Sequence, residues 1–211
     1  MMVFDARKVL AIPTIKFCDR NMQLGSADPG DTEAYFSAIP FEKVFHEGGT
    51  GGDRSIIEHR HAEVLATSPM GLVDTLQWVF CRTKAERETL LYLLGADADK
   101  WSAKILVSED LSLFDRRFVF LEDVQMSPEG LILQMSPRPD LGTVNIQVKG
   151  WDGRGNQVIN FTNSALPTQP QAPLRKWRIQ AVLPNGDYLV HIDLEGHLAF
   201  RAVVPLGDRL V

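Results

Sequence analysis

The pattern of hydrophobic and polar positions changes near residue 96 of this 211-residue chain. Before that point, short apolar runs typical of strands alternate with runs typical of helices. After it, nearly every apolar run is short, rich in β-branched or aromatic residues, and bounded by turn residues. We therefore predict an α+β chain with a boundary at residues 96 to 102, which gives a mixed α/β domain over residues 1–98 and a β domain over residues 99–211.

The first half predicts both strands and helices. The best-defined element is a helix that follows residue 82, because Thr83 and Glu86 form a capping-box pattern and Gly95 ends the run ERETLLYLL. Leu90, Leu91 and Leu94 of this run are expected to face a core. The other expected elements are strands over residues 12 to 18, 58 to 66 and 76 to 81, and short helices over residues 32 to 38 and 40 to 47.

The second half predicts an antiparallel β-sandwich of the immunoglobulin-like kind, because many short strands separated by turn signals are typical of that architecture. It does not have the Cys and Trp spacing of antibody domains. The pair Asn185-Gly186 favours a hairpin between its neighbouring strands. The expected strands are residues 103 to 108, 117 to 123, 131 to 136, 143 to 149, 157 to 162, 176 to 183, 188 to 193 and 197 to 203.

The charge balance argues against a general nucleic-acid-binding domain. The formal net charge is −5, and residues 1–99 carry ten Lys or Arg against fifteen Asp or Glu, whereas the rest carry twelve of each. Domains that bind nucleic acid nonspecifically are usually basic, because phosphate neutralisation supplies most of the affinity. Any contact with a polyanion would therefore have to use a small local patch. Residues 116–117 and 175–178 are the local basic groups, and they are also typical of solvated strand ends.

Cys18 and Cys81 are too few for a disulfide framework or a cysteine-based zinc site. Both lie in apolar strand patterns, so we expect them to be buried. The sequence has no apolar run approaching about 18 residues and no small-residue cleavage site near its start. We expect a cytoplasmic protein with no membrane span.

Two short motifs carry candidate chemistry, and each has more than one interpretation. The run GGTGGD, residues 48–53, lacks the ending of a nucleotide phosphate loop, so it is either a plain flexible loop or a mobile loop beside an active site. A strand over residues 58 to 66 would place His59, His61 and Glu63 on one face. That face could be a zinc site, a solvated edge strand, or a catalytic carboxylate with flanking donors.

The run IIEHRHAEVLATSPMGLVDTLQWVFCRTKAERETLLYLLG, residues 56–95, resembles the DarT family of single-stranded DNA ADP-ribosyltransferases, with RHAEVLA as its most specific motif. The runs IKFCDRNMQLG and AYFSAIPFEKVF resemble the family segments that precede it, so the resemblance covers about residues 9–95. It implies an enzyme of a toxin or defence system that splits the nicotinamide–ribose bond of NAD. The ADP-ribose would be attached to a thymidine base in single-stranded DNA.

The resemblance also implies roles for particular residues. It places the catalytic glutamate at Glu63 and a substrate-recognition loop at about residues 47–57, which includes Gly51 and Gly52. Arg54, Arg60 and His61 are then the local donors for a phosphate or a base. No metal is implied, and no NAD-binding residue can be assigned.

Family members also have an NAD-binding half before the matching segment, and about eight residues precede it here. We therefore expect this chain alone to bind NAD poorly or not at all, with a partner chain supplying that half or acting as an antitoxin. The alternative is a noncatalytic binding or assembly protein derived from such a transferase, with a β domain that docks onto another protein.

Overall fold

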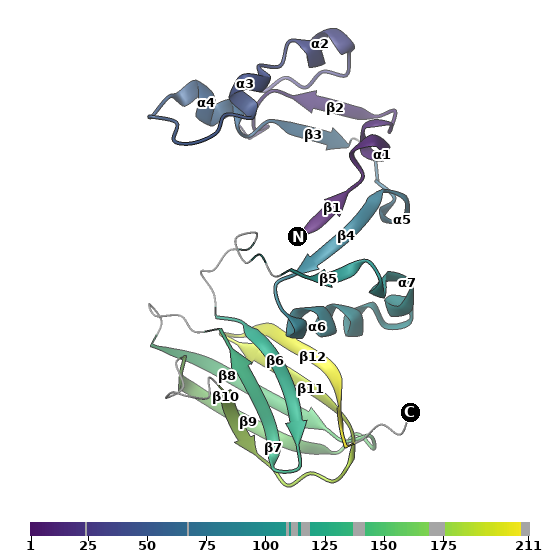
Figure 1. Cartoon of the computed structure of the whole chain (residues 1–211), viewed down its shortest axis with the longest axis vertical. Helices are drawn as coiled ribbons and strands as arrows, with labels where there is room; N and C mark the ends of the chain where they lie inside the picture. The colour runs from purple at the N-terminus through teal and green to yellow at the C-terminus, as the bar shows by residue number, and fades with distance from the viewer. Residues whose placement is uncertain are drawn as a thin grey trace. The chain divides into compact units, whose positions relative to one another are not determined.

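The computed structural model is an α+β structure with more strand than helix, which confirms the predicted class (Figure 1). The described residues are 1–23, 25–66, 68–108, 110, 114, 119–136, 142–168 and 176–207. Of the basic groups singled out above, residues 116, 117 and 175 lie outside this described part.

Packing divides the chain into two compact units. The amino-terminal unit is Val3–Gln77, and the carboxy-terminal unit is Met1–Met2 with Trp78–Val211. The predicted boundary at residues 96 to 102 differs from this division, because the helix that follows residue 82 packs with the β domain. Residues 98 to 102 themselves form a short helix.

The amino-terminal unit consists of short elements around one antiparallel strand pair. Strand β2 (Ile15–Cys18) pairs with β3 (Glu63–Ala66), and the expected strand over residues 12 to 18 is thus confirmed at its carboxyl end. The two predicted short helices are also present. The helices are α1 (Ala6–Leu10), α2 (Glu33–Ser37), α3 (Phe41–Val44), α4 (Arg54–His59) and α5 (Leu72–Thr75).

The predicted strand over residues 58 to 66 is wrong in its first half. Helix α4 ends at His59, and the strand begins only at Glu63. The helix forms because the Asp53 carboxylate accepts hydrogen bonds from the amides of Ser55 and Ile56, which satisfies donors that a helix start leaves free. The alternating face proposed for this segment therefore does not exist.

The carboxy-terminal unit begins within the predicted strand β4 (Leu76–Cys81) and continues into helix α6 (Lys84–Leu94). Strand β1 (Met2–Phe4), β4 and β5 (Ile105–Val107) form a small sheet in which β4 and β5 run parallel. Between α6 and β5 lie the 3₁₀ turn η1 (Gly95–Asp97) and α7 (Ala98–Ser102). The Thr83 hydroxyl accepts the amide of Glu86, as the capping pattern predicts, whereas the Glu86 carboxylate accepts the amide of Arg82.

The remaining strands form two antiparallel sheets with a shared hydrophobic core. Along β8, residues with even numbers are buried and point into that core, whereas those with odd numbers do not. A strand is present in each predicted range, but β5 is not part of these two sheets. The first sheet is β10 (Lys176–Gln180), β7 (Gly130–Met135) and β6 (Leu121–Ser127), and the second is β12 (His197–Leu206), β11 (Gly186–Leu194), β8 (Thr143–Trp151) and β9 (Gln157–Pro167).

The hairpin predicted at Asn185-Gly186 is wrong, because β10 and β11 belong to different sheets. The chain crosses between the sheets at this point. Just after the crossing, Tyr188 is buried and its hydroxyl donates a hydrogen bond to the carbonyl of Pro184. Burial raises the pKa of Tyr188, which keeps the hydroxyl protonated and able to donate.

Helix α6 lies across β12 and β6, one strand from each sheet (Figure 1). The Thr83 hydroxyl donates to the carbonyl of Leu121 on β6, and the Thr89 hydroxyl accepts the amide of Arg201 on β12. The residues that α6 buries fully are Ala85 and Thr89, and its leucines are half-buried or exposed. The helix is therefore joined to the β-sheets through small side chains and hydroxyl groups.

Replacing Tyr188 with phenylalanine should lower the unfolding free energy of the carboxy-terminal unit by about 1 kcal/mol, because the Pro184 carbonyl loses its donor while the ring still packs. Tryptophan fluorescence during urea unfolding measures this unit, since all four tryptophans lie after residue 77. The midpoint should fall with an unchanged slope. An unchanged midpoint would show that the hydrogen bond contributes nothing.

Candidate functional site

Glu63 lies at the first position of β3, directly opposite Cys18 of β2. Its side chain is half-buried, and Oε2 accepts a hydrogen bond from the amide of Met22 at 3.3 Å. The carboxylate is therefore held at the end of the strand pair, where the loop after β2 begins. A half-buried carboxylate with one fixed oxygen can still offer its other oxygen to a ligand.

The glycine-rich loop before α4 is held at both ends. Arg60 donates from Nη2 to the carbonyls of His46 and Gly48, at 2.6 Å in each case, and from Nε to His46 at 3.1 Å. At the other end, Asp53 caps α4. Gly51 and Gly52 have positive φ angles of 59° and 84° and are exposed, and a Cβ added at either would meet no atom within 4 Å. The loop thus combines anchored ends with an open tip.

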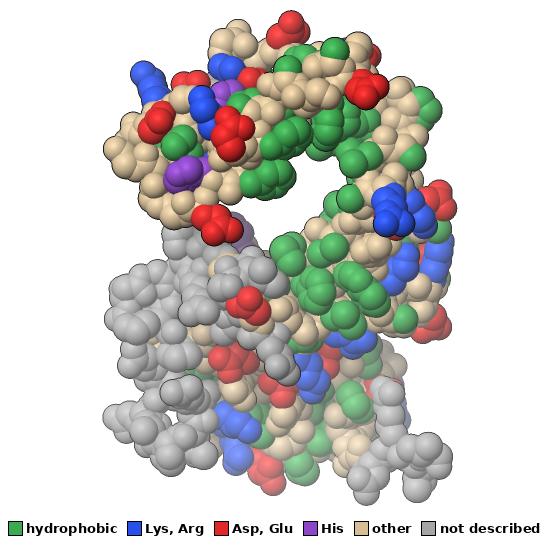
Figure 2. All heavy atoms as spheres, turned by 45° about the horizontal axis from the view of Figure 1, so that its top comes forward, with side chains coloured by type: hydrophobic (Ala, Val, Ile, Leu, Met, Phe, Trp, Pro, Cys, Tyr) green, Lys and Arg blue, Asp and Glu red, His purple; other side chains and the backbone are tan. Residues whose placement is uncertain are grey.

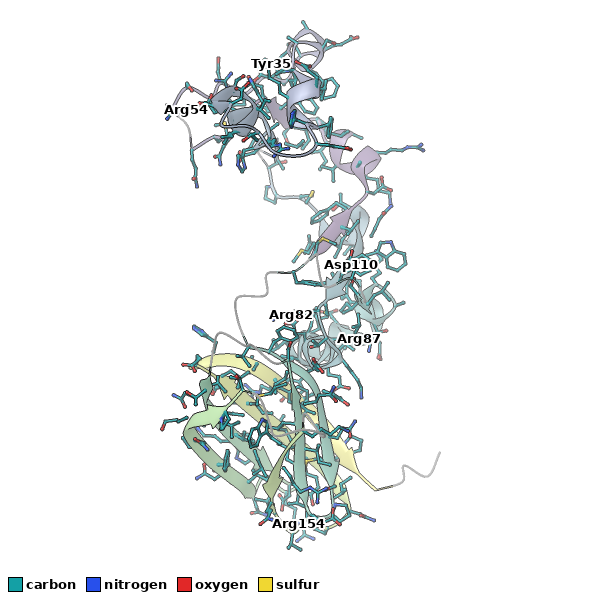
Figure 3. The ribbon with its side chains drawn as sticks, turned by 60° about the vertical axis from the view of Figure 1, so that its left-hand side comes forward. Tyr35, Arg54, Arg82, Arg87, Asp110 and Arg154 are labelled. Carbon is teal, nitrogen blue, oxygen red and sulfur yellow. The ribbon has the colours of Figure 1, made fainter. Side chains whose placement is uncertain are left out.

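Arg54 is exposed at the first residue of α4 (Figure 3). His61 is exposed just after the end of this helix. They remain candidate donors to a ligand. Arg60 differs from them, because its guanidinium donates to the backbone of residues 46 and 48 and thereby holds the loop. The structure therefore gives Arg60 a positioning contact that the sequence did not indicate.

A charged cluster adjoins this region at the end of β2. Arg20 forms two hydrogen bonds with Asp19, at 2.7 and 3.0 Å, and its other nitrogen lies 3.7 Å from Glu58. These contacts with Arg20 hold the pKa of the Asp19 carboxyl below its usual value. His59 is buried, with Nδ1 2.8 Å from the Asp19 carbonyl. The cluster fastens α4 to the end of β2.

The zinc interpretation of His59, His61 and Glu63 loses its geometric basis, since helix, turn and strand now separate the three residues. Within the described ranges, no group of three or more His, Cys, Asp or Glu side chains is placed to hold a metal ion. Both cysteines are free and buried, which confirms the expectation for Cys18 and Cys81.

A hollow of about 290 Å³ lies beside the charged cluster and was not anticipated from the sequence. Asp19, Arg20 and Tyr35 line it together with the loop after β2. The Tyr35 hydroxyl donates to the carbonyl of Asp28 at 2.7 Å, and burial raises the pKa of this tyrosine. The polar loop composition was its one sequence signal.

The amino-terminal unit also exposes much apolar surface. Phe17, Phe36, Phe41 and Phe45 form a row in which successive ring centres lie 4.7, 5.1 and 6.0 Å apart. Phe45 is 73% exposed, and Val64, which pairs with Phe17, is 51% exposed. Hydrophobic side chains gather on one side of this unit (Figure 2). Apolar surface of this extent is typical of a protein contact.

A second hollow, of about 440 Å³, lies within the carboxy-terminal unit beside the start of α6. Its walls are mostly apolar side chains from β6, β8, β11 and β12. Arg82 lies over the ring of Phe120 at 4.0 Å and forms an ion pair with Glu86. None of the residues singled out in the sequence for catalysis lines this hollow.

Replacing Arg60 with lysine should loosen the glycine-rich loop, because a lysine ammonium cannot reproduce the forked contact with two carbonyls. Hydrogen exchange of the amides at residues 47–53 should become several-fold faster, as measured by mass spectrometry. Arg54→Lys is the matched control and should leave exchange in this loop unchanged. Equal exchange in Arg60→Lys and the unmodified protein would contradict an anchoring role.

Comparison with models of known protein families gives no match for this chain, and no curated protein matches it. In the described part of the chain, no helix has the length and apolar character needed to cross a membrane.

Proposed function

We propose that the amino-terminal unit is the catalytic part of a DarT-like ADP-ribosyltransferase, which uses NAD to modify thymidine in single-stranded DNA. The observation that carries this proposal is the position of Glu63, which begins the strand that follows an anchored glycine-rich loop and helix α4. The resemblance of residues 56–95 to the family supplies the reaction. We place the protein in the cytoplasm and in a toxin or defence system.

The chemistry gives Glu63 two tasks. Cleavage of the nicotinamide–ribose bond leaves positive charge on the ribose, as in glycoside hydrolysis, and a nearby carboxylate stabilises that charge. The bonding electrons leave with nicotinamide, which departs as a neutral molecule. A nitrogen of the base then bonds to the ribose carbon, and its proton passes to the carboxylate. The Met22 amide holds Oε2, which leaves Oε1 for the reacting groups.

The loop residues take supporting roles. Gly51 and Gly52 give the tip the freedom to close around an unpaired base, while Arg60 fixes the start of the loop. Arg54 and His61 are exposed on either end of α4 and would donate to a phosphate or a base. In this proposal Arg60 contributes through the loop rather than by touching the substrate.

A partner chain would supply most of the contacts to NAD. The row of phenylalanines supports this part of the proposal, because it leaves an apolar surface open beside the strand that carries Glu63. An antitoxin that covers the same surface would block assembly of the complete site.

The test uses a thymidine-containing oligonucleotide and NAD, with the purified chain alone and with proteins that copurify from its native host. The expected result is a mass increase of the oligonucleotide by one ADP-ribose, which Glu63→Gln abolishes. Glu33→Gln, an exposed glutamate on α2, should transfer normally. If no preparation transfers ADP-ribose, the enzymatic proposal fails.

The second candidate function is a noncatalytic binding or assembly protein. The carboxy-terminal unit favours it, because its two sheets and the hydrogen bond from buried Tyr188 to Pro184 are similar to the sandwich and tyrosine corner of immunoglobulin-like domains. Such domains often serve in adhesion and docking. Copurification of a stable partner together with no transfer under any condition would favour this function over the first.

A further inference from the structure

The sheet β12-β11-β8-β9 carries three basic residues side by side on three neighbouring strands. Arg201 of β12 is paired with His191 of β11, and His191 is paired in turn with Lys149 of β8. Residues directly opposite in antiparallel strands have their Cβ atoms about 5 Å apart. Arg201, His191 and Lys149 therefore form one cluster, which we call the basic row.

The basic row lies on the outer face of this sheet. The neighbours of these residues along each strand, such as Val148, Val190 and Phe200, are buried in the core, and successive side chains of a strand point to opposite faces. The outer face is open beside Lys149 and along the end of β12, since Asn160, which pairs with Lys149, is exposed and Val203 is 47% exposed. At Arg201 itself, helix α6 packs against β12.

The basic row has little compensation from acidic groups. Among the described residues, the Lys149 amine has no hydrogen bond or ion pair, and the buried Nε of Arg201 has no acceptor. The Arg201 guanidinium lies 5.5 Å from the centre of the Tyr92 ring. His191 lies 3.1 Å from both oxygens of Asp193. One carboxylate thus lies among three basic side chains.

An apolar row runs beside the basic row, two residues away from it on each of the three strands. It consists of Val203, Leu189 and Trp151, which are paired in the same register. Two residues of a strand span about 7 Å. Asp193 lies on the opposite side of the basic row. The basic row therefore separates the apolar row from this carboxylate. Arg154 follows in the exposed turn after Trp151 (Figure 3).

We infer that this face binds a single strand of DNA, with phosphates on the basic row and a base stacked on Trp151. Proteins hold single strands by pairing a basic surface with aromatic side chains, and the flat face of an antiparallel sheet is one surface used for this. The choice of DNA as the nucleic acid rests on the proposed function.

The experiment measures fluorescence anisotropy of a labelled oligothymidylate with the full chain, without NAD and in the Glu63→Gln background, so that no transfer occurs. Lys149→Glu should weaken binding about tenfold or more. Lys149→Gln should reduce the slope of log affinity against log salt by about 0.7, the value for one phosphate contact on a single strand. Lys176→Glu and Lys176→Gln, at an exposed position of the other sheet, are the matched controls and should bind normally.

A second variant tests the stacking contact. Trp151→Leu should weaken binding about fivefold or more, whereas Trp151→Phe retains an aromatic face and should bind nearly as well as tryptophan. Thermal unfolding of each variant verifies that the sheet is intact. The inference is overturned if Lys149→Glu binds like the parent, or if Lys176→Glu weakens binding equally. It is also overturned if millimolar inorganic phosphate displaces the oligonucleotide fully, because the face would then be a simple anion site.

These outcomes separate the inference from the proposed function. Binding that depends on Lys149, in a protein that never transfers ADP-ribose, would sustain the inference and reject the enzymatic proposal. If the Lys149→Glu variant still transfers ADP-ribose to DNA and binds DNA as the parent does, the enzymatic proposal stands and the inference is rejected.

Discussion

Replacing Glu63 with glutamine is expected to reduce ADP-ribose transfer by about 10³-fold, the scale on which a positioned acid or base contributes to a reaction. Glutamine has nearly the same shape, and its carbonyl oxygen can still accept the amide of Met22. It cannot carry the negative charge that stabilises the ribose cation, nor can it take the proton of the base. The loss should therefore be chemical rather than structural.

The rate of oligonucleotide modification, followed by mass spectrometry at saturating DNA, measures this effect. Glu63→Asp keeps the charge but withdraws it by one methylene, so its rate should lie between those of glutamate and glutamine. Glu33→Gln controls for the loss of a charge in the same unit. A Glu63→Gln protein that retains a third or more of the activity would rule out this carboxylate as the catalytic group.

Replacing Gly130 with alanine should destabilise the carboxy-terminal unit by about 3 kcal/mol or more, within the range of severe backbone and packing changes. Gly130 has a φ angle of 131°, which side chains rarely tolerate. An added Cβ would lie 2.0 Å from the carbonyl oxygen of Ile179 and 2.8 Å from the amide of Ala181. Both atoms are backbone, so no side chain can rotate away to make room.

Gly155→Ala is the matched control for this substitution. Gly155 also has a positive φ angle, 83°, but nothing lies within 4 Å of its Cβ position. Gly155→Ala should therefore lower the unfolding free energy only by the conformational strain, about 1 kcal/mol. Urea unfolding followed by tryptophan fluorescence compares the two variants. Equal midpoints for Gly130→Ala and Gly155→Ala would show that close packing at Gly130 does not matter.

Local signals in the sequence predict some of these elements well and others poorly. Strand β4 coincides with the predicted range because the run LQWVFC is bounded by a helix start on its carboxyl side. The prediction of a strand just before Glu63 is wrong because the apolar residues there are few and adjacent. Their periodicity does not distinguish a short helix from a strand. The hydrogen bonds accepted by the Asp53 cap favour the helix. The hairpin prediction at Asn185-Gly186 is wrong because a turn signal does not indicate whether the next strand joins the same sheet.

The candidate sites show the same limit. Glu63 can be singled out from its surrounding motif, since that motif is continuous in the chain. The contact between Arg60 and the carbonyls of residues 46 and 48 has no such signature, because any arginine can reach a backbone oxygen that folding brings near. The basic row cannot be predicted from the sequence for a related reason. Lys149, His191 and Arg201 are far apart in sequence, and only the register of three strands unites them.

The position of helix α6 decides where the β domain can be separated from the rest of the chain. Strands β12 and β6 are outer strands of their sheets. Thr89 accepts a hydrogen bond from a backbone amide of β12, and Thr83 donates one to a backbone carbonyl of β6. Outer strands with free backbone groups recruit strands from other molecules and so promote aggregation. A fragment that begins at residue 99 would leave both strands uncovered. Helix α6 thus also protects the β-sheets from self-association, and an isolated β domain has to include it.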